Sequence, residues 1–157
     1  MNDGEPSYAP LVCMVVMSAA RTGKDGSQCF SGCGKGPAAL LAIDVIIPTR
    51  NAPEVLALTL AHYWANAHDD RLVASVTLLD NCSDAPGMDL VFMEAIRRGC
   101  RVIRHERNVG VWASVNRGLV LAGSEKMLVL TSDILLGPGA VASLARIQKE
   151  SGVLYLG

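Results

Sequence analysis

The stretch Ile43-Asp-Val-Ile-Ile-Pro-Thr-Arg-Asn51 decides the fold of this chain, because a short apolar run leads directly into a polar loop. A run of this length bounded by turn residues is typical of a buried strand. The next residues, 53–67, repeat Leu56, Leu60 and Trp64 on one face of a helix. A strand followed at once by an amphipathic helix is the first unit of an α/β pattern.

The same alternation continues along the rest of the chain. We expect helices at 53–67, 88–98, 112–122 and 138–149, and strands at 43–47, 73–79, 101–105, 126–131 and 153–156. Five strands that alternate with four helices imply right-handed crossovers. The sequence therefore predicts the α/β class, with a Rossmann-like, mainly parallel sheet and helices on both of its faces.

Residues 1–42 differ in composition from the rest of the chain. They hold 6 of the 15 glycines and 3 of the 5 cysteines, and they show no sustained period of a helix or a strand. Gly34-Lys35 is not part of a Walker A motif, because Cys29 stands where the first glycine is needed. We expect a poorly ordered N-terminal tail over 1–42 and a domain over 43–157.

Charge and hydropathy exclude several classes of protein. With 14 Lys and Arg against 15 Asp and Glu, the net charge of -1 argues against a nucleic-acid partner. The longest apolar run, 11–17, is too short to cross a bilayer, and acidic residues precede it where a secretory signal is basic. An odd number of irregularly spaced cysteines fits a reducing compartment. We expect a cytoplasmic protein without a transmembrane segment.

Polar residues collect after the first four expected strands, at 48–51, 80–84, 106–110 and 131–133. Each loop alone is weak evidence, because Asn, Asp, Ser and Gly are ordinary turn residues. In an open parallel sheet the carboxyl ends of the strands share one edge, and ligands bind outside that edge. Amides and carboxylates there suit a nucleotide, and a strand-end carboxylate suits Mg²⁺ or Mn²⁺ held against a diphosphate.

Two further patterns bear on this interpretation. Residues 137–142 match G-x-G-x-x-A, but the match contains a proline and no acidic residue follows at the required distance, which disfavours a dinucleotide-binding enzyme. Arg107 and Arg117 flank the third loop and are candidates to contact a diphosphate.

The four loops, in this order, closely resemble the inverting glycosyltransferases of family 2, which have the GT-A fold. Residues 48–51 are similar to the end of the family's V-I-I-P-T-x-N start, and 79–84 are similar to its V-D-N-x-S-x-D segment. Asn108-Val-Gly110 and Asn116-Arg-Gly118 match its pair of N-x-G signatures. Residues 131–133 and 137–140 stand where the family has its D-x-D or N-P-D element and its trailing P-G-A. The resemblance covers residues 43 to about 156.

The resemblance implies the N-terminal donor-binding part of such an enzyme, which binds a nucleoside-diphosphate sugar and a divalent cation, Mg²⁺ or Mn²⁺, for inverting transfer to an acceptor hydroxyl. Asp133 would hold the metal. Thr131 replaces the first acid of D-x-D, as in rhamnosyltransferase-like branches. The residues expected to bind the nucleotide are Pro48, Thr49, Asn51, Asp80, Asn81, Asn108, Gly110, Asn116 and Ser132.

The family's acceptor half and its general base follow the point where this chain stops. We therefore expect a domain truncated at its C-terminus, with no catalytic base identified, and an open sheet edge at 153–156 that a partner chain could cover. Two alternatives stay open: a non-catalytic nucleotide-binding remnant, and another α/β nucleotide-handling enzyme such as a nucleotidyltransferase. The latter favours a glycine-rich loop after the first strand, and 48–51 contains no glycine. The donor sugar, the nucleobase and the acceptor are not specified by the sequence.

Overall fold

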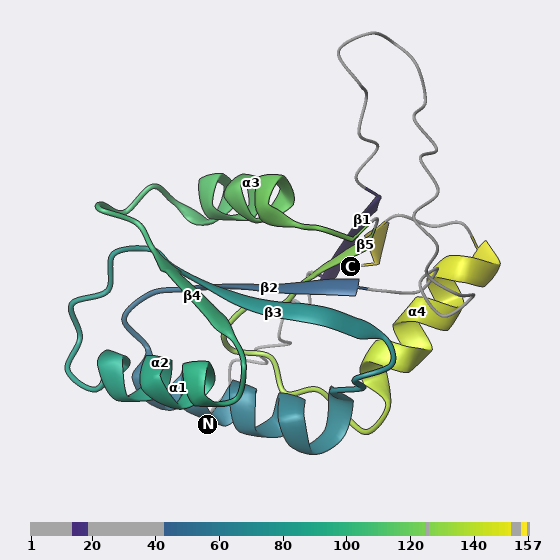
Figure 1. Ribbon diagram of the computed structural model, residues 1–157, viewed down its shortest axis with the longest axis horizontal. Coiled ribbons are helices and arrows are strands. Elements are labelled where there is room, and N and C mark those ends of the chain that lie inside the picture. Colours follow the sequence, from purple (N-terminus) through teal and green to yellow (C-terminus); the bar gives the residue numbers. More distant parts are fainter. Residues whose placement is uncertain (1–13, 19–42, 125, 152–154, 157) are drawn as a thin grey trace, which may run out of the picture.

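The computed structural model describes residues 14–18, 43–124, 126–151 and 155–156 as a sheet with helices on both faces (Figure 1). No helix within these ranges is long and apolar enough to cross a membrane. The elements in chain order are β1 Met14–Ser18, β2 Ile43–Thr49, α1 Pro53–His62, the π-helix η2 Tyr63–Ala67, β3 Val73–Asp80, α2 Met88–Arg97, β4 Arg101–Arg104, α3 Val111–Leu121, β5 Lys126–Val129, α4 Ala140–Ser151 and β6 Tyr155–Leu156.

The sheet has the strand order β4-β3-β2-β5-β1-β6. Strand β2 pairs in parallel with both β3 and β5, and β3 pairs in parallel with β4. These four strands form the parallel group that the strand–helix alternation implies, so the predicted α/β class is confirmed.

Strand β2 is buried over its whole length because helices cover both sides of it. Its alternate residues Val45 and Ile47 join the core that includes residues of α1, α2 and α4, whereas Ile46 faces the smaller core that includes residues of α3. Figure 1 shows α3 above the sheet, with α1 and α2 below it. A strand with two buried faces is mainly apolar, and the buried carboxylate of Asp44 in this strand accepts hydrogen bonds from the backbone N–H groups of Gly123 and Ser124, both at 2.7 Å.

Helix α3 packs unusually close to the sheet at Gly118. A Cβ atom at this position would lie 2.8 Å from Ile46 Cγ2 and 3.3 Å from Leu79 Cδ1. Any larger side chain would have to push the helix away from β2 and β3. The glycine of the second N-x-G signature therefore has a packing role in this fold.

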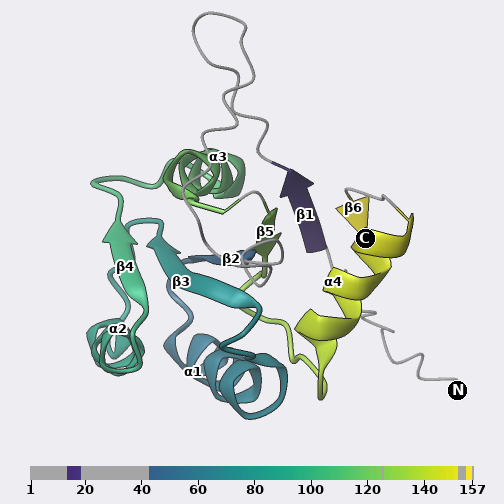
Figure 2. The same ribbon diagram turned by 45° about the vertical axis from the view of Figure 1, so that its right-hand side comes forward.

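Strand β1 is an element that the sequence analysis did not anticipate. It pairs antiparallel with β5, where Val15 is opposite Val129, and antiparallel with β6, where Val15 is opposite Tyr155. Figure 2 shows β1 between these two strands. A five-residue apolar strand carries too little periodicity to be recognised in a glycine-rich stretch. The other residues of the expected tail, 1–13 and 19–42, lie outside the described residues.

Some element boundaries also differ from the expectation. The helix predicted over 53–67 changes to a π-helix at Tyr63, whose buried hydroxyl donates to His68 Nδ1 at 2.9 Å. The last helix begins at Ala140, so Pro138 lies in the preceding turn and not in the first helical turn. Strands β2 and β3 extend to Thr49 and Asp80, which places both residues inside the sheet.

Candidate functional site

A crevice of about 350 Å³ lies at the carboxyl ends of β2, β3 and β5. This is the edge of an open α/β sheet at which ligands bind. Three of the four polar loops of the sequence contribute to it, together with the first residue of α3. The lining residues are Pro48, Thr49, Arg50, Ala52, Val55, Asn81, Val111, Thr131, Ser132 and Asp133.

The structure divides the predicted site residues into two groups. Those that line the crevice are Pro48, Thr49, Asn81, Ser132 and Asp133. Those that do not line it are Asn51, Asp80, Asn108, Gly110 and Asn116. Arg50 lines the crevice with an exposed side chain although the sequence analysis did not select it. Its position inside the Pro48–Asn51 loop could have indicated that it lines the site.

Asn51 ties the first polar loop to the second. Its Oδ1 accepts hydrogen bonds from the backbone N–H groups of Asp84 at 2.8 Å and Ala85 at 3.1 Å, and its Nδ2 donates to Asp84 Oδ1 at 2.8 Å. Its own backbone N–H donates to Ser83 Oγ at 2.9 Å. The backbone φ of 50° lies in the left-handed region that Asn tolerates better than most residues. Both polar atoms of the side chain therefore help to join the loops.

Asp80 is completely buried and organises the second loop. One carboxylate oxygen accepts from the backbone N–H of Ser83 at 3.1 Å and from the Ser83 hydroxyl. The other lies 2.8 Å from Arg104 Nε, an ion pair without hydrogen-bond alignment. The two residues are register partners in the β3–β4 ladder. Asp80 therefore fixes the second loop, which lies behind the crevice.

Asn81 connects the second loop to the third loop. Its Nδ2 donates to Asn108 Oδ1 at 2.6 Å, and its Oδ1 accepts from the N–H of Val109 at 2.7 Å. Asn108 Oδ1 also accepts from the N–H of Gly110 at 3.0 Å. Gly110 has a φ of 83°, a conformation that favours glycine, and α3 begins at the next residue. The loops behind the crevice thus hold one another in place.

The side of the crevice that follows β5 is different, because its carboxylate is free. Asp133 is exposed and makes no hydrogen bond or ion pair with any described residue. Thr49 Oγ1, across from it on β2, is buried and has no partner in the described part of the chain. Thr59 Oγ1 donates to the carbonyl of Ser132 at 2.8 Å, which fixes this turn to α1. The Asp133 carboxylate is therefore available to a ligand in the crevice, whereas Thr49 Oγ1 is buried.

The crevice suits a divalent cation that takes only part of its ligands from protein. Mg²⁺ and Mn²⁺ prefer oxygen, and Mg²⁺ typically keeps several waters and uses one or two carboxylates plus substrate phosphates. Asp133 beside open space meets that requirement. Among the described residues no group of three or more His, Cys, Asp or Glu could hold a metal alone. The donor set fits a metal–diphosphate complex and not an all-protein metal site.

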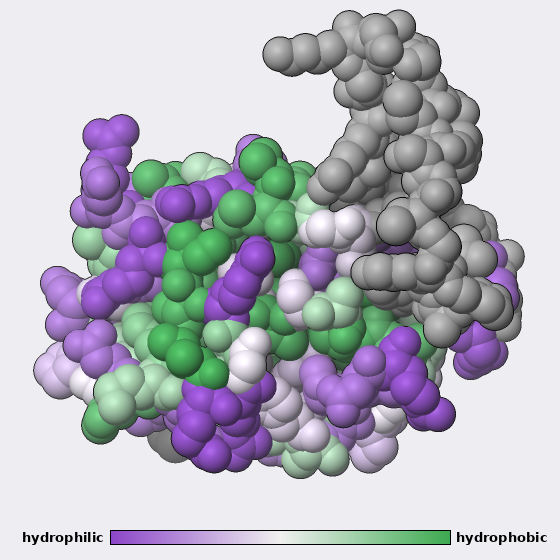
Figure 3. All heavy atoms as spheres, viewed as in Figure 1, coloured by the Kyte–Doolittle hydropathy of each residue, from purple (hydrophilic) through white to green (hydrophobic). Residues whose placement is uncertain are grey.

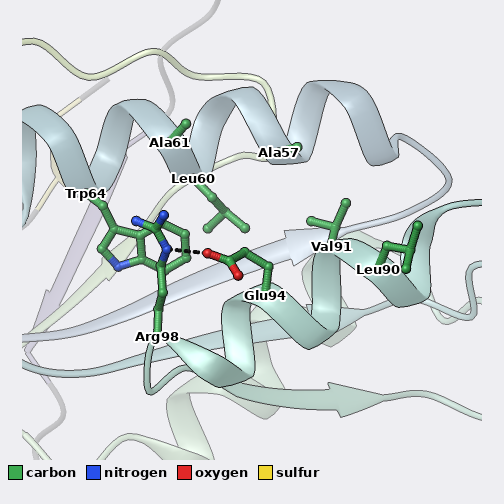
Figure 4. Close-up of a pocket in the computed structure, with 8 residues that line it drawn as sticks. All are labelled: Ala57, Leu60, Ala61, Trp64, Leu90, Val91, Glu94 and Arg98. Atoms are coloured by element: carbon green, nitrogen blue, oxygen red, sulfur yellow. Dashed lines mark hydrogen bonds and ion pairs between the residues drawn. The ribbon is translucent and has the colours of Figure 1, made fainter.

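A second hollow, of about 250 Å³, lies between α1 and α2 (Figure 4). Its lining is mainly apolar, and its two charged side chains, Glu94 and Arg98, form an ion pair with each other. Arg98 stacks over the ring of Trp64 at 4.7 Å and its Nε lies 2.6 Å from Glu94 Oε1. None of the predicted site residues lines this hollow. The crevice at the strand ends is therefore the candidate site.

A known protein family matches most of this chain. The model for glycosyl transferase family 2 matches residues 44–156, which include every residue that lines the crevice. None of the curated proteins matches the chain in sequence.

Solved glycosyltransferase structures have a similar fold. The structure of TarS from S. aureus gives a TM-score of 0.60 at 21% identity and covers 71% of this chain and 20% of that chain. The mannosyltransferase PcManGT from Pyrobaculum calidifontis, in complex with GDP-Man and Mn²⁺, gives 0.57 at 19% identity and covers 68% and 31%. GalNAc-T7 with UDP, GalNAc and Mn²⁺ gives 0.61 at 22% identity and covers 71% and 21%. The chain thus spans less than a third of the length of these proteins, and the predicted GT-A fold is confirmed.

Proposed function

The chain belongs to glycosyl transferase family 2, and we propose that its crevice binds a nucleoside-diphosphate sugar with a divalent cation, as the donor site for inverting transfer to an acceptor hydroxyl. The observation that carries this proposal is the pairing of free polar groups across one hollow. Thr49 and Asp133 both line the crevice. The Asp133 carboxylate is exposed and has no partner in the described residues, and Thr49 Oγ1 is buried without one.

The lining residues divide the donor between them. Thr49 and Asn81, at the ends of β2 and β3, line the crevice and are proposed to contact the base and ribose, and Ser132 lies next to Asp133 in the loop after β5. Arg50 offers an exposed guanidinium, which is suited to a negatively charged diphosphate. We propose that Asn51, Asp80, Asn108 and Gly110 act indirectly, since their contacts hold the loops that carry these groups. Asn116, which is exposed on α3 outside the crevice, stays a prediction.

The proposed reaction is a direct displacement at the anomeric carbon. A divalent cation held by Asp133 would neutralise charge that develops on the departing diphosphate. The acceptor hydroxyl must lose its proton to a base. Within the described residues, Asp133 is the only carboxylate that lines the crevice, and a carboxylate committed to a cation is a poor base. We therefore propose that this chain supplies the donor half and that the base comes from elsewhere.

The nucleobase and the sugar are open within this proposal. GDP-Man is bound in PcManGT and UDP in GalNAc-T7, which supports testing both nucleotides. Thr131, a neutral residue where the motif has its first acid, lines the crevice and supports including a dTDP-rhamnose donor for rhamnosyltransferase-like specificity. A domain that binds nucleotide without transfer is the second candidate, because the described crevice offers no free base.

A cytoplasmic location and a partner chain are also proposals. Cys82 and Cys100 are free thiols in the described part of the chain, as is common in a reducing compartment. Strand β6 stands last in the strand order, so a partner chain could pair with its outer edge.

The test is calorimetric titration of the purified chain with UDP, GDP and dTDP sugars, with Mn²⁺, with Mg²⁺ and with EDTA. We expect saturable binding of one donor that EDTA abolishes and that Asp133→Asn weakens. The matched control is Glu54→Gln, which removes an exposed carboxylate in the first turn of α1, outside the crevice.

The same samples are then assayed for transfer to a panel of acceptors. We expect little or no transfer, because loss of a positioned base and acceptor costs many orders of magnitude in rate. Rapid multiple turnover by the isolated chain would contradict the donor-half proposal. Absence of binding to every nucleotide would overturn the proposed function altogether.

A further inference from the structure

A separate hollow of about 260 Å³ lies where β4 leads into α3. It shares no lining residue with the crevice. A hydrogen bond from the N–H of Val109, which lines this hollow, to Oδ1 of Asn81, which lines the crevice, lies between the two. Figure 3 shows hydrophilic side chains over the loop between β4 and α3. The residues that line the hollow are Arg104, His105, Glu106, Arg107, Val109 and Arg117.

The arginines of this hollow are not equally occupied. Arg104 is held by the buried Asp80 at 2.8 Å and contacts Asp89 at 3.3 Å. Arg107 makes no hydrogen bond or ion pair to any described residue, and Arg117 contacts only the ring of His105 among them. One carboxylate, that of Glu106, also lies in the lining. Even after it is counted, the lining carries an excess of positive charge, in a chain whose net charge is -1.

His105 orients Arg117. Arg117 Nη1 lies 3.3 Å from His105 Nδ1, and because a guanidinium only donates, this nitrogen must accept. The other ring nitrogen, Nε2, then carries the proton and lies 3.2 Å from Ser114 Oγ. Burial lowers the pKa of His105, and the charge of Arg117 lowers it further. The neutral ring therefore fixes one guanidinium at the hollow and adds no charge of its own.

We propose that this hollow is a second anion site, distinct from the crevice, and that it takes a phosphate monoester or free phosphate between Arg107 and Arg117. Arginine forks bind phosphate oxygens in pairs. A phosphate monoester carries nearly two negative charges at neutral pH, which suits two guanidinium groups that form no ion pair with a described carboxylate better than a single carboxylate does. The sequence analysis named both arginines as candidates to contact the diphosphate. The structure places them on the far side of the Asn81–Val109 bridge instead. The inference does not depend on nucleotide binding in the crevice.

The experiment titrates the full chain with inorganic phosphate and, separately, with a hexose 1-phosphate, at constant ionic strength so that screening does not change. Binding is followed by calorimetry and by the NMR signals of the His105 ring. We expect saturable binding with a dissociation constant on the order of 1 mM and a rise of the His105 pKa when the anion is bound. Equal affinity for the two ligands would identify a free-phosphate site, and tighter binding of the sugar phosphate would identify a phosphorylated acceptor or effector.

The variants separate this site from general charge and from the crevice. Arg107→Gln with Arg117→Gln should weaken phosphate binding at least tenfold. Arg101→Gln removes one positive charge from β4 outside the hollow and should change the affinity less than twofold. Asp133→Asn should also leave it unchanged. Equal losses in Arg101→Gln and in the double variant, loss of binding in Asp133→Asn, or absence of saturation in the unmodified chain would each overturn the proposal.

Discussion

The two sides of the crevice each carry an aspartate near a strand end, but the two carboxylates differ in burial and in partners. On the β3 side, Asp80 is fully buried and its carboxylate contacts Ser83 and Arg104. On the β5 side, Asp133 is exposed and binds no described residue. Both carboxylates come at or just after the carboxyl end of a parallel strand, and in the sequence they look alike.

The difference shows that a strand-end carboxylate can act on the ligand or on the protein, but not freely on both. A buried carboxylate must be paired, and once paired it defines the position of its loop. An exposed carboxylate without partners keeps its charge available for a cation. The β3 side is therefore held by its own contacts, and the β5 side carries the carboxylate that we propose binds the cation.

The largest effect is expected from Asp133→Asn. Nucleotide binding in the presence of Mn²⁺ should weaken about 100-fold, which is about 2.7 kcal/mol, because the variant removes the carboxylate proposed to bind the metal. The free energy of unfolding should change by less than about 0.5 kcal/mol, as for other exposed substitutions. Calorimetry with Mn²⁺ and urea unfolding measure the two quantities. A large loss of stability would show that Asp133, like Asp80, has a structural role.

Asp80→Asn should show the reverse pattern. It keeps the size of the side chain but removes the charge that pairs with Arg104, and we expect a loss of about 2 kcal/mol in the free energy of unfolding. The side chain of Arg104 is 49% exposed and can turn to water, which keeps the loss below that of a fully buried pair. Urea unfolding with an unchanged m-value would confirm it. A variant as stable as the parent would remove the distinction between the two sides.

Asn51→Ala should cost about 1.5 kcal/mol in the free energy of unfolding. The variant loses the side-chain contacts to Asp84 and Ala85 and places alanine at a φ of 50°. Asn51→Gly is the matched control, because glycine accepts this backbone conformation and isolates the hydrogen bonds. If alanine and glycine were equally destabilising, backbone strain would not contribute and the contacts to the second loop would account for the whole loss.

The smallest expected effect is a pH dependence of the free energy of unfolding that comes from His105, next to the β3 side. His105 donates its backbone N–H to the carbonyl of Asp80, and its ring has a pKa below the ordinary value of 6.5. The unfolded chain therefore binds more protons than the folded chain between these two pKa values, so stability should fall slightly as the pH drops below about 6.5. His105→Gln should flatten this slope in urea unfolding at pH 5 to 7. An identical slope in the variant would assign the titration to another histidine.

The sequence predicted the parallel group and the edge at which the polar loops meet, because strand and helix periods and turn residues are local signals. It did not separate Asp80 from Asp133, since their roles depend on register: Arg104 lies opposite Asp80 only after β3 and β4 have paired. The same applies to Asn51, whose partners are some thirty residues away in the chain. Arg107 and Arg117 are near the third loop in sequence, yet they line another hollow. Local patterns predicted the edge of the sheet where the crevice lies, and tertiary pairing decided which residues line it.

The position of β1 has a consequence for how this chain reaches its folded state. Strands β2, β3 and β4 follow one another and pair with their sequence neighbours, so they can assemble early. Strand β1 is made first but pairs residue 15 with residue 129, and β6 joins the sheet through β1. Contacts between residues so far apart close a long loop and form slowly. During synthesis the first strand must wait until β5 has emerged, and until then the open side of β5 is the place where a nascent chain is most exposed to pairing with the wrong strand.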